Sequence, residues 1–174
     1  MLKINSIAPD FKAKTTIGDI EFHDWLGDSW GVLFSHPKDF TPVCTTELGA
    51  LANLSEAFES RNVKVIGLSV DSVDDHIKWL DDIKDVSGIK PEYPIIADED
   101  LNVAKLYNML EESIDESAAE RTAMDNLTVR TVFIIRPDKR IALHQIMLNR
   151  NPFYVPLDLP TFIPSRHFLH LLVH

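Results

Sequence analysis

Cysteine is almost absent from this sequence, and its scarcity limits the thiol chemistry that the chain can perform. Cys44 is the only cysteine among 174 residues. An internal disulfide, a two-cysteine redox pair and a cysteine-rich metal site are therefore all excluded. Any thiol chemistry must be carried out by Cys44 alone.

Long apolar runs and an excess of positive charge are also missing. No stretch approaches the roughly 20 apolar residues of a membrane-spanning helix, and the first five residues lack the apolar core of a signal peptide. We therefore expect a cytoplasmic protein with no stable membrane insertion. The formal net charge of -10 disfavours nucleic-acid partners, because polyanions recruit Lys and Arg.

Apolar residues alternate between strand-like and helix-like patterns along the chain. A hydrophobic fraction of 45% is enough to bury a core, and the length fits one domain. Apolar runs at 30–34 and 63–70 favour strands, and they flank a segment with helical spacing. The apolar residues of this segment are Leu48, Leu51, Leu54 and Phe58. The region is thus predicted to be a strand, helix, strand unit.

A second helical pattern follows the Asp71-Ser72 pair and is predicted to end near Gly88. Its predicted apolar face consists of Val73, Ile77, Leu80 and Ile83. Further predicted elements are a strand at 94–97, a helix at 101–110, and strands at 129–135 and 141–147. The acidic stretch 111–120 is predicted to be a solvated loop or exposed helix. Strands alternating with helices predict an α/β, thioredoxin-like fold with a central mixed sheet flanked by helices.

Cys44 lies in a segment that has the signals of a helix start. Thr41 is a suitable N-cap, Pro42 suits the first helical position, and Cys44 falls in the first turn. A thiol at the positive end of a helix is typically a thiolate, so we expect a lowered pKa for Cys44. The alternative is a buried structural cysteine.

The segment 35–48, Ser-His-Pro-Lys-Asp-Phe-Thr-Pro-Val-Cys-Thr-Thr-Glu-Leu, resembles the active-site segment of the one-cysteine peroxiredoxins. The similarity extends over about residues 5–143. It implies a thiol-dependent peroxidase that reduces hydrogen peroxide and organic hydroperoxides without a cofactor. Cys44 would be the peroxidatic nucleophile, becoming a sulfenic acid that an external thiol such as glutathione reduces. The family also commonly forms dimers, so a homodimer is expected.

The resemblance also assigns roles around Cys44. Thr41 and the Cys44 backbone N–H would bind the peroxide oxygens, Arg130 would stabilise the thiolate, and Glu47 would orient Arg130. The substrate pocket would be lined by His36, Pro37, Pro42, Val43 and Glu47. On position alone, Arg130 is also consistent with a charge on an edge strand, and His36 with a packed histidine.

A second motif, Gly-Asp-Ser-Trp-Gly at 27–31, matches a hydrolase pattern. In the resembling mammalian proteins it belongs to a phospholipase site, which maps onto His23, Ser29 and Asp138. A nucleophile elbow requires a strand before the serine, whereas here the strand follows it, so a tight turn is favoured. A third hypothesis is an inactive peroxiredoxin-like chaperone or binding protein.

The resemblance fades after residue 143, where the family continues through a Gly-Arg-Asn segment into a long helix and a second domain. We expect a peroxiredoxin domain at 1–148 and a divergent, proline-rich tail at 149–174, with a truncated or altered C-terminus. Only Arg150-Asn151 partly matches the family segment. Three histidines near the end of the tail have helical spacing, but we assign no metal.

Overall fold

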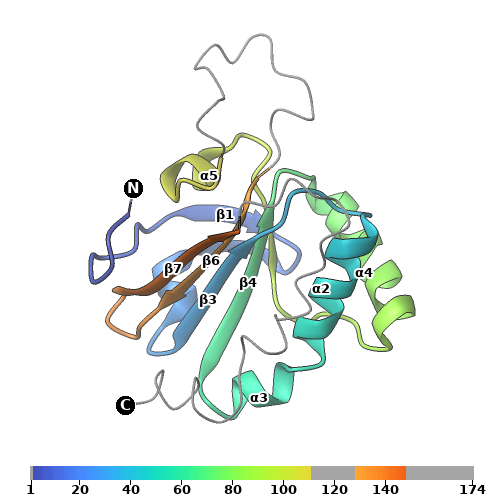
Figure 1. Cartoon of the computed structure of the whole chain (residues 1–174), viewed down its shortest axis with the longest axis horizontal. Coiled ribbons are helices and arrows are strands. Elements are labelled where there is room, and N and C mark those ends of the chain that lie inside the picture. Colours follow the sequence, from blue (N-terminus) through green and yellow to red (C-terminus); the bar gives the residue numbers. More distant parts are fainter. Residues whose placement is uncertain (1, 111–127, 148–174) are drawn as a thin grey trace.

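The computed structural model describes residues 2–110 and 128–147, which form a seven-stranded sheet with helices (Figure 1). The strands are β1 (Lys12–Thr15), β2 (Gly18–Glu21), β3 (Trp30–Ser35), β4 (Val63–Ser69), β5 (Ile95–Ala97), β6 (Arg130–Ile135) and β7 (Ile141–Met147). The helices are α1 (Phe22–Leu26), α2 (Pro42–Ala52), α3 (Ser55–Glu59), α4 (Val73–Ser87) and α5 (Asn102–Leu106). The predictions for the acidic stretch 111–120 and the tail 149–174 lie outside the described residues.

The sheet is mixed, as predicted. Its strand order is β2-β1-β5-β4-β3-β6-β7. Strand β4 pairs in parallel with β3 and β5, whereas β6 is antiparallel to both β3 and β7. The predicted strand, helix, strand unit is confirmed as β3, α2 with α3, and β4. The predicted antiparallel final hairpin is confirmed as β6 and β7.

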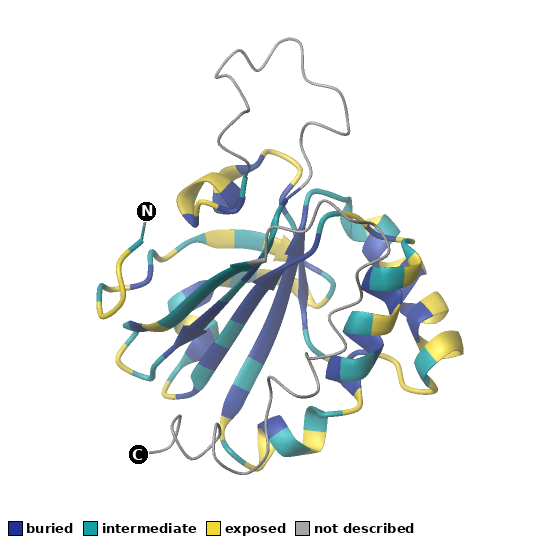
Figure 2. Ribbon diagram, viewed as in Figure 1, coloured by how far each residue is buried: buried dark blue, intermediate teal, exposed yellow. Residues whose placement is uncertain are grey.

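Two apolar layers cover the two faces of the central strands, which are mostly buried in Figure 2. Along β4, Val63 and Val65 pack with the residues of α2 and α4, whereas Ile66 and Leu68 pack with those of α1 and α5. This alternation follows from the two-residue period of a strand. Burying each such side chain contributes about 1.5–3 kcal/mol, so both layers stabilise the sheet.

Helix α4 has a capping residue at each end, Ser72 at its start and Gly88 at its end. The Ser72 hydroxyl accepts a hydrogen bond from the Asp75 backbone N–H at 3.2 Å. Gly88 has a φ of 81°, in the left-handed region that closes helices and favours glycine. The predicted start and end of this helix are confirmed.

The predicted apolar face of α4 is partly wrong. Ile77 is 45% exposed, whereas His76 and Trp79 are fully buried. Two polar partners, Asp39 and the Ile96 carbonyl oxygen, bind the His76 ring and allow it to lie inside. Apolar periodicity alone does not detect a histidine with such partners.

Two other helical predictions need correction. The apolar segment from Leu48 to Phe58 is two helices, because the chain leaves helical geometry at Leu54 (φ -101°, ψ 7°). The helix predicted at 101–110 covers only Asn102–Leu106, and Asn108 adopts a φ of 54° that cannot continue it. Local backbone geometry ends both helices early.

The sequence patterns did not reveal the N-terminal hairpin of β1 and β2 or the short helix α1. These elements are only four or five residues long, so they show no clear period. None of the described helices is both long and apolar enough to cross a membrane.

Candidate active site

Cys44 lies in the first turn of α2, as predicted. The Thr41 hydroxyl accepts a hydrogen bond from the Cys44 backbone N–H at 3.4 Å, and Pro42 is the first helical residue. The Thr45 hydroxyl donates to the Thr41 carbonyl oxygen at 2.8 Å and accepts from Trp79 Nε1 at 3.0 Å. Helix α4, which lies beside α2 in Figure 1, thus fixes the turn that carries the thiol.

Arg130 approaches Cys44 from the first residue of β6. Its Nη2 is 3.4 Å from Cys44 Sγ, and its Nε donates to Glu47 Oε2 at 3.1 Å. Strand β6 lies between β3 and β7, so the alternative of an edge-strand charge is wrong. The Arg130 side chain is 18% exposed and the Glu47 side chain 10%. Both are shielded from water, which strengthens their interaction.

The expectation of a lowered Cys44 pKa is wrong for this structure. Burial raises the pKa of the Cys44 thiol above its ordinary value, since the residue is only 1% exposed. The hydrogen bond with Thr41 and the charge of Arg130 lower this pKa, and the charge of Glu47 raises it. The effect of burial on the pKa of Cys44 is therefore larger than the opposing effects of Thr41 and Arg130.

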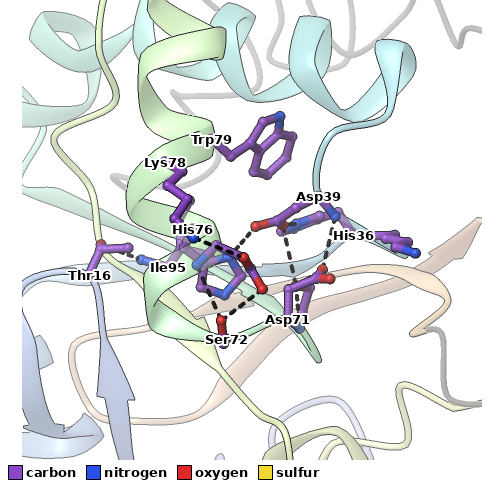
Figure 3. Close-up of polar contacts among 12 residues, drawn as sticks. Thr16, His36, Asp39, Asp71, Ser72, His76, Lys78, Trp79 and Ile95 are labelled. Atoms are coloured by element: carbon purple, nitrogen blue, oxygen red, sulfur yellow. Dashed lines mark hydrogen bonds and ion pairs between the residues drawn. The ribbon is translucent and has the colours of Figure 1, made fainter. Parts of the chain in front are cut away.

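His36 belongs to a buried hydrogen-bond network that sequence reasoning did not find (Figure 3). Its Nε2 lies 2.7 Å from Asp39 Oδ1, and Asp39 Oδ2 lies 2.5 Å from His76 Nδ1. The His36 ring is also 5.0 Å from the Trp79 ring. The only local signal in the sequence was a histidine three residues before an aspartate, because His76 lies 37 residues after Asp39 along the chain.

The other predicted pocket residues flank Cys44 with different exposure. Pro37 and Val43 are half-buried, whereas Pro42 is exposed. Together with His36 and Glu47 they belong to the loop before α2 and to its first two turns. Their contact with a peroxide stays a prediction.

Within the described residues, one group combines side chains of types that bind metals. Ligand atoms of His36, Asp39 and Asp71 lie within 4.8 Å of one another. They are already engaged in the network, where Asp71 Oδ2 accepts from the Ser69 hydroxyl and the Asp39 N–H. We therefore describe these residues as a hydrogen-bond network and assign no metal or cofactor to them.

The predicted secondary hydrolase site is not assembled. Ser29 donates to Asn62 Oδ1 at 2.8 Å, and Asp138 pairs with Arg136 at 2.7 Å. His23 Nε2 lies 2.9 Å from the Ala8 carbonyl oxygen. No hydrogen bond among the described residues joins the three predicted members to one another.

The Gly-Asp-Ser-Trp-Gly segment forms the tight turn that was favoured. The Ser29 N–H donates to the Leu26 carbonyl oxygen at 3.2 Å, and Gly27 has a φ of 55°. Helix α1 ends just before this turn and strand β3 begins directly after it, so the serine is followed by a strand and not by a helix. A nucleophile elbow needs the opposite order.

Comparison with known proteins places the chain in a family. It belongs to the AhpC/TSA family, whose sequence profile matches residues 4–144. It is 50% identical to the 1-Cys peroxiredoxin of Dictyostelium discoideum over 140 residues, covering 80% of this chain and 54% of that protein. It is 51% identical to Peroxiredoxin-6 of Rattus norvegicus over 146 residues, covering 82% of this chain and 63% of that protein. The resemblance to one-cysteine peroxiredoxins is thus confirmed.

Solved structures confirm the thioredoxin-like peroxiredoxin fold. The Peroxiredoxin 6 of Arenicola marina gives a TM-score of 0.77 at 41% identity, covering 99% of this chain and 72% of that one. A yeast mitochondrial 1-Cys peroxiredoxin gives 0.74 at 50% identity, covering 87% and 71%. The chain spans only 54% and 63% of the two sequence relatives named above.

Proposed function

We propose that this protein is a thiol-dependent peroxidase that reduces hydrogen peroxide and organic hydroperoxides at Cys44. One observation carries the proposal: Arg130 Nη2 lies 3.4 Å from the sulfur of the chain's single cysteine, at the start of a helix. A guanidinium keeps its charge at every relevant pH, so it can stabilise both a thiolate and the charge on a departing oxygen.

The proposed reaction forms one bond and breaks another. The Cys44 thiolate attacks one peroxide oxygen, the S–O bond forms and the O–O bond breaks. The other oxygen leaves with the bonding electron pair and takes up a proton, giving water or an alcohol. The sulfur is oxidised by two electrons to a sulfenic acid, and the peroxide is reduced by two. No cofactor is needed for this exchange.

Two side chains beside Cys44 can assist the proposed reaction. Burial raises the pKa of the Cys44 thiol above its ordinary value, whereas Thr41 and Arg130 lower it. Arg130 can stabilise the negative charge, and the Thr41 hydroxyl can align the peroxide. A larger thiolate population alone gives only a limited gain in rate, so we attribute most of the acceleration to alignment and charge stabilisation in the transition state.

An external thiol completes the proposed cycle, since the sequence has no second cysteine to resolve the sulfenic acid. The yeast mitochondrial structure concerns a thiol resolving mechanism via glutathione and thioredoxin systems. This supports a thiol reductant here, and we propose glutathione or a thiol of similar size.

The proposal is tested by following peroxide consumption in the presence of excess glutathione. The wild-type protein should consume peroxide catalytically, and Cys44→Ser should reduce the rate to that of glutathione alone. An inactive chaperone or binding protein predicts the same low rate for both proteins. Equal consumption by both would therefore remove the peroxidase assignment.

We also propose that the protein forms a homodimer in the cytoplasm. Among the described residues, β7 has a strand partner on one side only, and an exposed strand edge can pair with a second copy. One relative, of Saccharomyces cerevisiae, is named mitochondrial, so location needs its own test by fractionation. Light scattering at several concentrations tests the dimer, and a constant monomer mass would exclude it.

A further inference from the structure

The thiol of Cys44 and the guanidinium of Arg130 come from two different segments of the chain. Cys44 follows the loop that leaves the end of β3, whereas Arg130 is the first residue of β6. These strands lie side by side in Figure 1, and the last Cα pair at this end joins Ser35 to Thr131. On its other side Arg130 pairs with Met147 of β7. Arg130 therefore lies one residue beyond the part of β6 that is paired with β3.

The Ser35 hydroxyl binds the backbone on both sides of Arg130. It donates to the Val129 carbonyl oxygen at 2.5 Å and accepts from the Thr131 backbone N–H at 3.1 Å. The Val129 oxygen also accepts from the Thr131 hydroxyl at 3.3 Å, but that bond stays within one segment. Ser35 is buried, so water does not replace its two bonds. One side chain thus connects β3 to the residues before and after Arg130.

A second buried hydroxyl connects the same two segments. Thr128 Oγ1 donates to the His36 carbonyl oxygen at 2.6 Å. The His36 N–H in turn donates to the Leu68 carbonyl oxygen of β4 at 3.0 Å. Residues 128–131 are therefore held to residues 35–36 by three side-chain hydrogen bonds. We call Ser35 and Thr128 the hydroxyl clamp.

The clamp acts on the backbone and not on the thiol. Side chains alternate along a strand, so the Ser35 and Thr131 pair lies on one face of the sheet and Arg130 on the other. Val132, which shares the face of Arg130, packs against the apolar layer that contains Cys44. Any effect of Ser35 on the thiol must therefore pass through the backbone to Arg130.

The position of Arg130 has to be accurate for the site to work. Its Nη2 lies 3.4 Å from Cys44 Sγ, and its Nε donates to Glu47 Oε2 at 3.1 Å. A displaced backbone would lengthen the distance to the sulfur, and the attraction between charges falls with distance. A misplacement of about 1 Å can lower a catalysed rate by as much as about 100-fold.

We propose that Ser35 and Thr128 are positioning residues for the Cys44 reaction, because their hydroxyls clamp the backbone around Arg130 to the end of β3. Removal of either hydroxyl takes a hydrogen-bond partner from buried backbone groups of this region, so the segment shifts and Arg130 shifts with it. This inference rests on the proposed peroxidase function and adds to that site two residues that do not contact the thiol.

Ser35→Ala and Thr128→Val each remove one hydroxyl of the clamp. Either substitution should raise the Cys44 pKa by about half a unit, less than Arg130→Met, because the guanidinium is displaced and not lost. The rate of Cys44 oxidation by hydrogen peroxide at pH 7 should fall about tenfold. Absorbance near 240 nm across a pH titration measures the pKa without peroxide, and intact mass against time measures the rate.

A double-mutant cycle distinguishes a positioning role from a structural one. Each clamp substitution is combined with Arg130→Met, and the Cys44 pKa is measured again. Once the guanidinium is absent, loss of a clamp hydroxyl should change this pKa no further, so the shifts should not add. Equal shifts in the wild-type and Arg130→Met backgrounds would reject the positioning role. A wild-type Cys44 pKa in folded Ser35→Ala and Thr128→Val proteins would reject it as well.

Thr15→Val is the matched control. The buried Thr15 hydroxyl also bridges two backbone groups, donating to the Gly18 carbonyl oxygen at 2.6 Å and accepting from the Ile17 N–H at 3.2 Å. These bonds lie in the turn between β1 and β2, so their loss should reduce stability but leave the Cys44 pKa and rate unchanged. The same rise in pKa for Thr15→Val would show a general effect of lower stability and would overturn the proposal.

The two measurements separate the possible failures. A wild-type protein whose Cys44 does not react with peroxide would reject the proposed function, whereas the pKa cycle would still test the clamp. Should Ser35→Ala fail to fold, the cycle with Thr128→Val decides, because Thr128 binds the same two segments.

Discussion

At the residue scale, Arg130 is the side chain whose removal should change Cys44 most directly. Burial and the charge of Glu47 raise the pKa of the Cys44 thiol, whereas the charge of Arg130 lowers it. We expect Arg130→Met to raise the Cys44 pKa by about one unit, equivalent to about 1.4 kcal/mol. Thiolate absorbance near 240 nm across a pH titration measures this shift.

Arg136→Met is the control for that titration, because Arg136 pairs with the exposed Asp138 and does not contact Cys44. It should leave the thiol pKa unchanged. An Arg130→Met titration that coincides with the wild type would mean that the guanidinium does not stabilise the thiolate.

Thr41 should affect both helix stability and the thiol. Its hydroxyl caps α2 by accepting from the Cys44 N–H, and its hydrogen bond also lowers the Cys44 pKa. Thr41→Ala should therefore lower the free energy of unfolding by about 1 kcal/mol and raise the thiol pKa, whereas Thr41→Ser should restore both. Urea denaturation and the 240 nm titration provide the two measurements.

Ser72→Ala removes the equivalent cap of α4 and serves as the comparison. It should reduce stability by a similar amount without changing the Cys44 pKa. If both alanine variants raised that pKa equally, the effect of Thr41 would be a consequence of lower stability and not of its hydrogen bond.

At the element scale, Asp39 connects three parts of the chain. Its carboxylate binds His76 of α4, and its N–H donates to Asp71 beyond β4. Because the folded-state pKa of Asp39 lies below its ordinary value, its stabilisation is present above about pH 4 and is lost as the pH falls through the folded pKa. We expect Asp39→Asn to destabilise the protein by about 2 kcal/mol at pH 7 and by less near pH 3, measured by urea denaturation.

An exposed aspartate provides the control. Asp81 also has a pKa below its ordinary value, owing to its hydrogen bond with Lys90, but it lies on the surface. Asp81→Asn should change stability little at either pH, because exposed ion pairs are screened. A loss for Asp39→Asn that stayed constant from pH 7 to pH 3 would contradict the charged pairing of the network.

The elements that the sequence predicted well are those with a long run of regularly spaced apolar residues or with clear capping residues. Strand β4 and helix α4 were predicted within a few residues, because apolar repeats and the Ser72 and Gly88 caps act locally. The contacts of Asp39 were not predictable, since they depend on how the loop, β4 and α4 meet in space. The effect of burial on the Cys44 pKa was missed for the same reason, as burial is a property of the folded chain.

At the scale of the whole molecule, the two ends of β3 are predicted to have separate roles. Ser29 lies in the turn before this strand, whereas Cys44 follows the loop after it. Ser29→Ala removes the hydrogen bond to Asn62, so it should slightly reduce stability but leave the rate of Cys44 oxidation within about twofold of wild type. Loss of Cys44 oxidation in a folded Ser29→Ala protein would show that the two sites are coupled.

The central claim is that this one thiol receives the oxygen from a peroxide, and intact-mass measurement tests it most directly. One equivalent of hydrogen peroxide should add one oxygen atom to the wild-type protein, as a sulfenic acid that glutathione removes. Cys44→Ser should gain none under the same conditions. The same thiol-reversible addition to Cys44→Ser, or no addition to the wild type, would contradict the account.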